Sequence, residues 1–83
     1  MLAIRYSKPA LKSLVRMPRQ TAVRIQRELN LIANDPKAYR GDWKRLEGVA
    51  LWWLRVADWR VICDLREREL TILVVKIGSR GDV

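Results

Sequence analysis

A run of alternating side chains from Val49 to Leu65, VALWWLRVADWRVICDL, restricts the fold of this chain more than any other feature. With residues 57–58 as a two-residue turn, the run predicts a β-hairpin in which Arg55 lies opposite Arg60. Successive side chains of a strand point to opposite faces, so one face of this hairpin is almost wholly apolar. That face consists of Trp52, Leu54, Val56, Trp59, Val61, Cys63 and Leu65. It is the expected core face.

The second face of the hairpin carries the two arginines side by side. Its members are Leu51, Trp53, Arg55, Arg60, Ile62 and Asp64. Like charges directly opposite each other destabilise a sheet. Pairing of each arginine with a nearby acid (Asp58, Asp64 or Glu67) is the simpler alternative, but one acid does not easily neutralise both. We therefore expect the arginine pair to bind an anion.

The charge of the whole chain agrees with an anionic partner. Its 83 residues, expected to form one domain over 1–83, carry a net charge of +8 and a pI near 10.6. Twelve of the 17 cations are arginine, which suits bidentate contacts with phosphate. Nucleic acid is the favoured partner, ahead of an acidic protein, a membrane surface or a plain solubilising role.

Several classes of function are disfavoured by what the chain lacks. A single cysteine, Cys63, excludes an intramolecular disulfide, and the absence of histidine removes Ser-His triads and most catalytic zinc sites. We expect no cofactor and no metal. No signal peptide and no membrane-length apolar run is present, so a cytoplasmic location is expected.

The remaining elements can be placed from caps and periodicity. Residues 2–6 predict a strand, Ser7 caps a helix that runs to Met17, and Pro18 starts a second helix that stops at 34–36. Residues 36–48 are expected to be irregular, and residues 66–69 to form a charged turn. Residues 70–77 predict a central strand because they are apolar on both faces. The sequence thus predicts an α+β fold, in which an N-terminal strand and a helical hairpin pack on an antiparallel three-stranded meander, and the first strand pairs with the last.

The order of these segments resembles a known group of proteins. YSKPALKSLVRMP, NDP, KRLEG, LWWLRVADWRVICDL and VVKIGSRGDV together resemble the RelE/ParE superfamily of type II toxin–antitoxin toxins, in its RelE-like branch. The RelE branch implies a ribosome-dependent messenger RNA endonuclease that inhibits translation. The ParE branch implies a DNA gyrase inhibitor that is not a nuclease, and this alternative stays open. A third reading is a toxin fold that has lost activity and serves as a binding module.

The resemblance also implies roles for individual residues. Arg55, Arg60 and Arg80 match the arginines that hold the scissile phosphate while the ribose 2′-hydroxyl attacks it. Trp53 stands where the RelE pattern has a lysine proposed as general base, so the proton acceptor is left open. The candidates for proton transfer are Lys44, Lys76, Asp64, Asp82 and ribosomal RNA.

Contacts to the RNA and to a protein partner complete the predicted site. Residues expected to bind RNA are Lys44, Arg45, Trp53 and Lys76. Trp53 shares the face of the arginines, where it either stacks on a base or is covered as a second core residue. The expected partners are the ribosome, messenger RNA and an acidic antitoxin that folds on binding.

Overall fold

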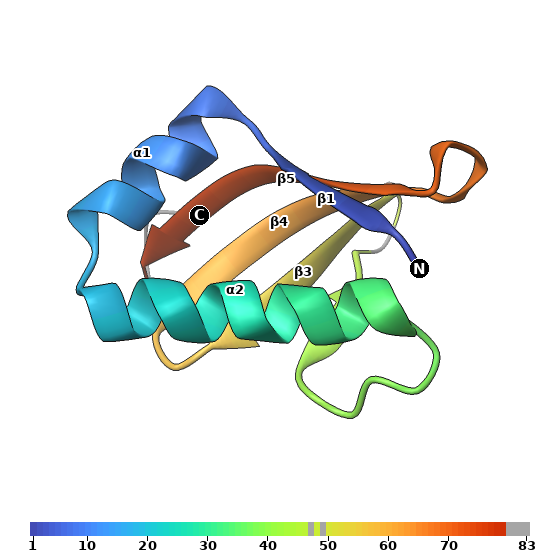
Figure 1. Ribbon diagram of the computed structural model, residues 1–83, viewed down its shortest axis with the longest axis horizontal. Coiled ribbons are helices and arrows are strands. Elements are labelled where there is room, and N and C mark those ends of the chain that lie inside the picture. The colour runs from blue at the N-terminus through green and yellow to red at the C-terminus, as the bar shows by residue number, and fades with distance from the viewer. Residues whose placement is uncertain (47, 49, 80–83) are drawn as a thin grey trace.

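Two helices lie on one face of a five-stranded sheet in the computed structural model, which describes residues 1–46, 48 and 50–79 (Figure 1). In chain order the elements are β1 (Ala3–Tyr6), α1 (Lys8–Arg16), α2 (Arg19–Asn34), β2 (Trp43–Arg45), β3 (Leu51–Val56), β4 (Trp59–Arg66), a 3-10 turn (Glu67–Glu69) and β5 (Thr71–Ser79). The predicted α+β fold is confirmed, with the strand and helical hairpin at the start of the chain as expected.

The first and last strands meet within the sheet, whose order is β1-β5-β4-β3-β2. β1 runs parallel to β5, with Ala3 opposite Thr71, and every other neighbouring pair is antiparallel. β5 therefore has a strand on each side along its first half. This interior position explains why its sequence is apolar on both faces.

One expectation about the sheet is wrong. The segment 36–48 was expected to be irregular, yet β2 forms an edge strand within it, so the antiparallel meander has four strands rather than three. A strand of three residues is too short to show alternation in sequence. Its position is fixed instead by pairing with β3 and by the stacking of Trp43 on Trp52, whose ring centroids are 5.0 Å apart.

Helix α1 docks beside β5 through two serine hydroxyls. Ser7 is the N-cap, as predicted: its Oγ accepts a hydrogen bond from the Ala10 amide at 3.2 Å and donates one to the Val75 carbonyl at 2.6 Å. Ser13 Oγ donates to the Ile77 carbonyl at 2.9 Å. Because β1 ends at Tyr6, the two hydroxyls bond β5 carbonyls beyond the last β1–β5 residue pair.

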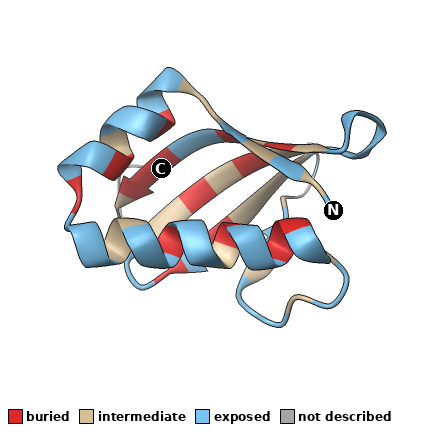
Figure 2. Cartoon of the chain, in the orientation of Figure 1, coloured by how far each residue is buried: buried red, intermediate tan, exposed pale blue. Residues whose placement is uncertain are grey.

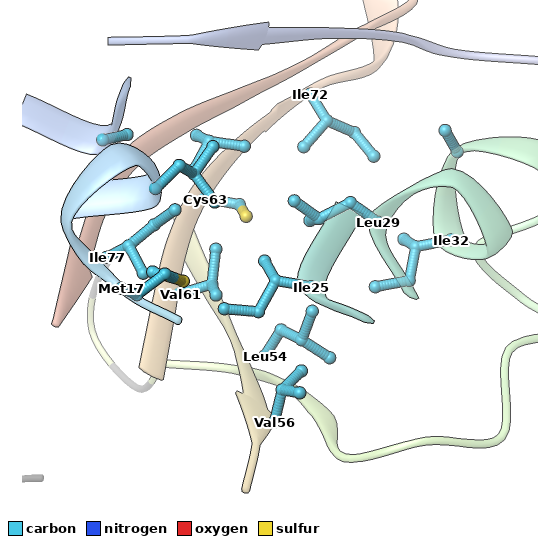
Figure 3. Packing of buried hydrophobic residues seen from close by; sticks show 14 residues of the cluster. Met17, Ile25, Leu29, Ile32, Leu54, Val56, Val61, Cys63, Ile72 and Ile77 are labelled. Carbon is cyan, nitrogen blue, oxygen red and sulfur yellow. The ribbon is translucent and has the colours of Figure 1, made fainter. Parts of the chain in front are cut away.

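The core lies between the helices and the sheet, and Figure 2 shows buried residues in red on both layers. Its fully buried larger side chains are Ile25, Leu29, Ile32, Leu54, Val61, Cys63, Ile72 and Val74. Figure 3 shows α2 side chains interleaved with those of β3 and β4. Replacing one such leucine by alanine typically costs about 2–5 kcal/mol of stability. The packing of this layer supports the β3–β4 hairpin from the helix side of the sheet.

Candidate nucleic-acid interface

The β3–β4 hairpin places Arg55 directly opposite Arg60, in the predicted register. Leu54 and Val56 are buried against the helices, and alternation therefore turns the side chain of Arg55 to the face of the sheet that no helix covers. We call this the open face. Residues 57–58 form the turn, with Ala57 in the left-handed region at φ 53°. The core contacts thus fix the positions of both arginines.

No carboxylate neutralises the arginine pair within the part of the chain that the structure describes. Asp64, the acid of the hairpin's open face, accepts a hydrogen bond from Arg66 Nε at 3.0 Å. This bond raises the pKa of Arg66, and Glu69 adds to the effect from 3.5 Å. The two ion pairs recorded for the described residues both use Arg66. The simpler alternative, pairing of Arg55 and Arg60 with nearby acids, is therefore not what these residues do.

Trp53 supports one of the two guanidinium groups. The Cζ atom of Arg60 lies 5.0 Å from the centroid of the Trp53 ring, which is a cation–π distance. Trp53 is half-buried, so it is an open-face residue rather than part of the core. The sequence predicts that both residues lie on one face of the hairpin. Their contact depends on side-chain rotamers and was not predicted.

A row of four side chains crosses the open face next to the arginines. Lys44 lies opposite Trp53, Trp53 opposite Ile62, and Ile62 opposite Lys76. Two exposed lysines thus flank an apolar strip formed by a tryptophan and an isoleucine. The row is two residues, or about 7 Å, from the arginines along the strands. This spacing suits a chain of phosphates and bases better than a single small anion.

The other predicted site residues are distributed differently. Arg45 lies opposite Trp52 and so belongs to the helix side of the sheet, apart from the open-face cations. Adjacent residues of a strand point to opposite faces, so Lys44 and Arg45 lie on different sides of the sheet. The role of Arg45 in RNA binding stays a prediction. Gly78 lies opposite Arg60 on β5. Arg80 and Asp82 fall outside the described residues.

A cavity formed by other described residues lies apart from the arginine pair. An apolar cavity of about 470 Å³ includes Trp43, Trp52 and Leu65 in its wall, but neither arginine. Residues 1–46, 48 and 50–79 contain no cluster of three or more His, Cys, Asp or Glu side chains suited to a metal. No helix among them is long and apolar enough to span a bilayer.

The architecture is shared with small α+β proteins of known structure. A chain of the archaeal RelE–RelB complex from Pyrococcus horikoshii superposes with a TM-score of 0.83 at 23% identity, covering 99% of this chain and 98% of that one. The isolated Escherichia coli RelE toxin gives 0.83 at 12% identity, with coverages of 100% and 88%. A toxin–antitoxin complex from Mycobacterium tuberculosis gives 0.78 at 15% identity, with coverages of 98% and 93%. The chain therefore has the RelE fold.

The sequence itself gives the family. Residues 4–83 match the family described as the ParE toxin of the type II toxin–antitoxin system parDE. The chain belongs to this family, and it is a type II toxin with a RelE-like fold. No curated protein is similar enough in sequence to count as a match. The resemblance to the RelE/ParE superfamily is confirmed.

Proposed function

We propose that this toxin is a ribosome-dependent messenger RNA endonuclease whose open-face arginines hold the scissile phosphate. One observation carries the proposal: Arg55 lies opposite Arg60, and neither forms an ion pair with a described residue. Two unneutralised guanidinium groups suit an anionic phosphodiester, and their two positive charges suit the doubly negative phosphorane that forms when it is attacked. The RelE fold of the solved neighbours supports the same reading.

The reaction that suits these groups is attack by an adjacent ribose hydroxyl. The 2′-oxygen forms a bond to phosphorus while the bond from phosphorus to the 5′-oxygen breaks. The proton leaves the 2′-hydroxyl and another reaches the departing 5′-oxygen, so that a cyclic phosphate remains. Arg55 and Arg60 stabilise the charge on the phosphorane, a contribution of about 2.7–4 kcal/mol for one such donor. Arg80 is assigned the same role from the family pattern.

Proton transfer is not supplied by the arginine pair or by Asp64. Arginine keeps its proton at neutral pH, and Asp64 is occupied by Arg66. We infer that the ribosome orients the strand and provides the missing acid and base, which makes cleavage depend on it. Lys44 and Lys76 then contact neighbouring phosphates, while Trp53 stacks on a base.

The test uses ribosomes that present a defined messenger RNA, with cleavage measured by primer extension. Arg60→Ala is expected to cut at least tenfold more slowly than the wild type. Arg68→Ala removes an equal charge from the exposed 3-10 turn and should cut at the wild-type rate. Equal rates for Arg60→Ala and the wild type would reject the proposal.

A gyrase inhibitor without nuclease activity is the second candidate, because the matching family is described as ParE. A supercoiling assay separates the two. Gyrase-linked DNA cleavage complexes, without cutting of ribosome-bound RNA, would favour this candidate. An acidic antitoxin is the proposed protein partner in both cases, as suggested by the net charge of +8 and by neighbours solved as RelE–RelB complexes. Coexpression with the adjacent gene should restore growth.

A further inference from the structure

The positive charge of this chain is concentrated at its beginning. Residues 1–27 contain seven lysines and arginines and no aspartate or glutamate. Residues 28–83 hold the other ten cations and all nine acids, so they carry a net charge of only +1. β1, α1 and the first half of α2 therefore carry most of the net positive charge, and none of them supplies the open-face arginines.

Helix α1 arranges three of these cations in a line. Lys8, Lys12 and Arg16 are spaced four residues apart, and all three are exposed. Residues with this spacing lie one above another, about 6 Å apart along the helix. The buried Ala10 and Leu14 mark the opposite side of α1. We call the line the α1 stripe. None of its cations forms an ion pair among residues 1–46, 48 and 50–79.

The docking of α1 sets the position of the stripe relative to the sheet. Ser13 bonds the Ile77 carbonyl of β5, and Arg16 lies one turn further along on the same flank of the helix. Figure 1 shows α1 beside the end of β5. Lys76, which lies on the open face, directly precedes Ile77. The edge of β5 therefore separates the α1 stripe from the open-face cations.

We propose that the α1 stripe is a second nucleic-acid contact, which binds backbone phosphates of a base-paired RNA. The helix has the sequence KPALKSLVR and offers no aromatic side chain on which a base could stack. It therefore suits a duplex, whose bases are already stacked and whose phosphates face outward. This binding goes beyond the proposed cleavage and does not require it.

The experiment measures binding of a fluorescein-labelled RNA hairpin by fluorescence anisotropy at several salt concentrations. The stripe variant is Lys8→Gln/Lys12→Gln/Arg16→Gln. Its matched control, Lys37→Gln/Arg40→Gln/Arg68→Gln, removes the same charge from exposed positions outside α1. The slope of log K against log salt is expected to fall by about 2–3 for the stripe variant, and by less than about 1 for the control.

Two results would overturn the proposal. One is a stripe variant that keeps the wild-type slope, and the other is a control that loses as much as the stripe variant. A stripe variant that binds RNA normally but loses the antitoxin would also overturn it, because the surface would then bind protein. Circular dichroism checks the fold, and single Lys12→Gln and Arg16→Gln variants replace the triple variant if it does not fold.

A further variant tests the proposed nuclease activity independently of the α1 stripe. Arg55→Gln/Arg60→Gln leaves α1 unchanged and should abolish cutting, while the contribution of the α1 stripe to the salt slope remains when the stripe substitutions are compared in this background. Cutting by this double variant would count against the nuclease alone, because the stripe is judged only by the salt slope.

Discussion

The guanidinium of Arg60 lies over the ring of Trp53, with 5.0 Å between its Cζ atom and the ring centroid. The electron-rich face of an indole attracts a cation by about 0.5–1 kcal/mol at an exposed site. This is similar in size to the repulsion expected between like charges that face each other on neighbouring strands. Trp53 thus offsets part of the cost of holding Arg60 opposite Arg55.

Removal of the Trp53 ring should impair the site through Arg60. Trp53→Ala is expected to slow RNA cleavage several-fold, because the guanidinium loses its support and a base loses its platform. Trp53→Phe keeps an aromatic face and should restore most of the rate. The measurement is single-turnover cleavage on ribosomes. Phenylalanine and alanine variants with equal rates would exclude a positioning role for the ring.

The arginine pair should lower the free energy of unfolding of the free protein. Arg55→Thr is expected to raise the free energy of unfolding by about 0.2–1 kcal/mol at low salt, because the like-charge contact disappears. The gain should shrink in high salt. Urea unfolding at two ionic strengths measures both effects. Arg5→Thr, which removes an exposed arginine opposite Leu73, is the control and should show neither.

The turn of the same hairpin stores backbone strain at Ala57. Its φ of 53° is a conformation that glycine adopts at no steric cost. Ala57→Gly is therefore expected to stabilise the fold by about 0.4–1 kcal/mol. Ala3→Gly, in extended β1, should instead destabilise it. Thermal unfolding compares the two variants, and a loss of stability at both positions would contradict the assignment of strain.

Cys63 should be chemically inert in the folded state. Its side chain is 0% exposed, and burial raises the pKa of the thiol from 9.0 to about 12. The folded protein thus retains a proton that the unfolded chain loses, so the stabilising contribution is complete below pH 9 and lost as the pH rises toward 12. We expect slow alkylation by iodoacetamide at pH 8 until urea unfolds the protein. Cys63→Ala should reduce the fall in stability above pH 9.

The hairpin could be predicted because two independent patterns agree on it. Alternation places Leu54, Val56 and Val61 on the core face, and a two-residue turn then leaves a single register. The short strand β2 lacked both signals, since three residues show no period. Because β2 is not predicted, the sequence alone does not place Lys44 and Arg45 on opposite faces of a strand, where the structure has them.

Contacts between side chains of distant elements could not be predicted from the sequence. Neither the cation–π contact of Arg60 nor the bond from Ser13 to Ile77 follows from any local pattern, because each depends on rotamers and on the docking of distant elements. The register shift between β4 and β5 at Ile62 and Cys63 is similar in kind. An extra residue in one strand of a pair bends it without altering its composition.

The hydrogen bond from Ser7 to Val75 joins positions 68 residues apart, and β1 pairs with β5 over a similar span. During translation β1 is made long before β5, so the sheet is incomplete until this interior strand has been synthesised. Such long-range closure slows folding. A toxin built in this way completes its sheet only after residue 79 has left the exit tunnel. The complete fold, and with it the supported position of the arginine pair, is therefore acquired late in synthesis.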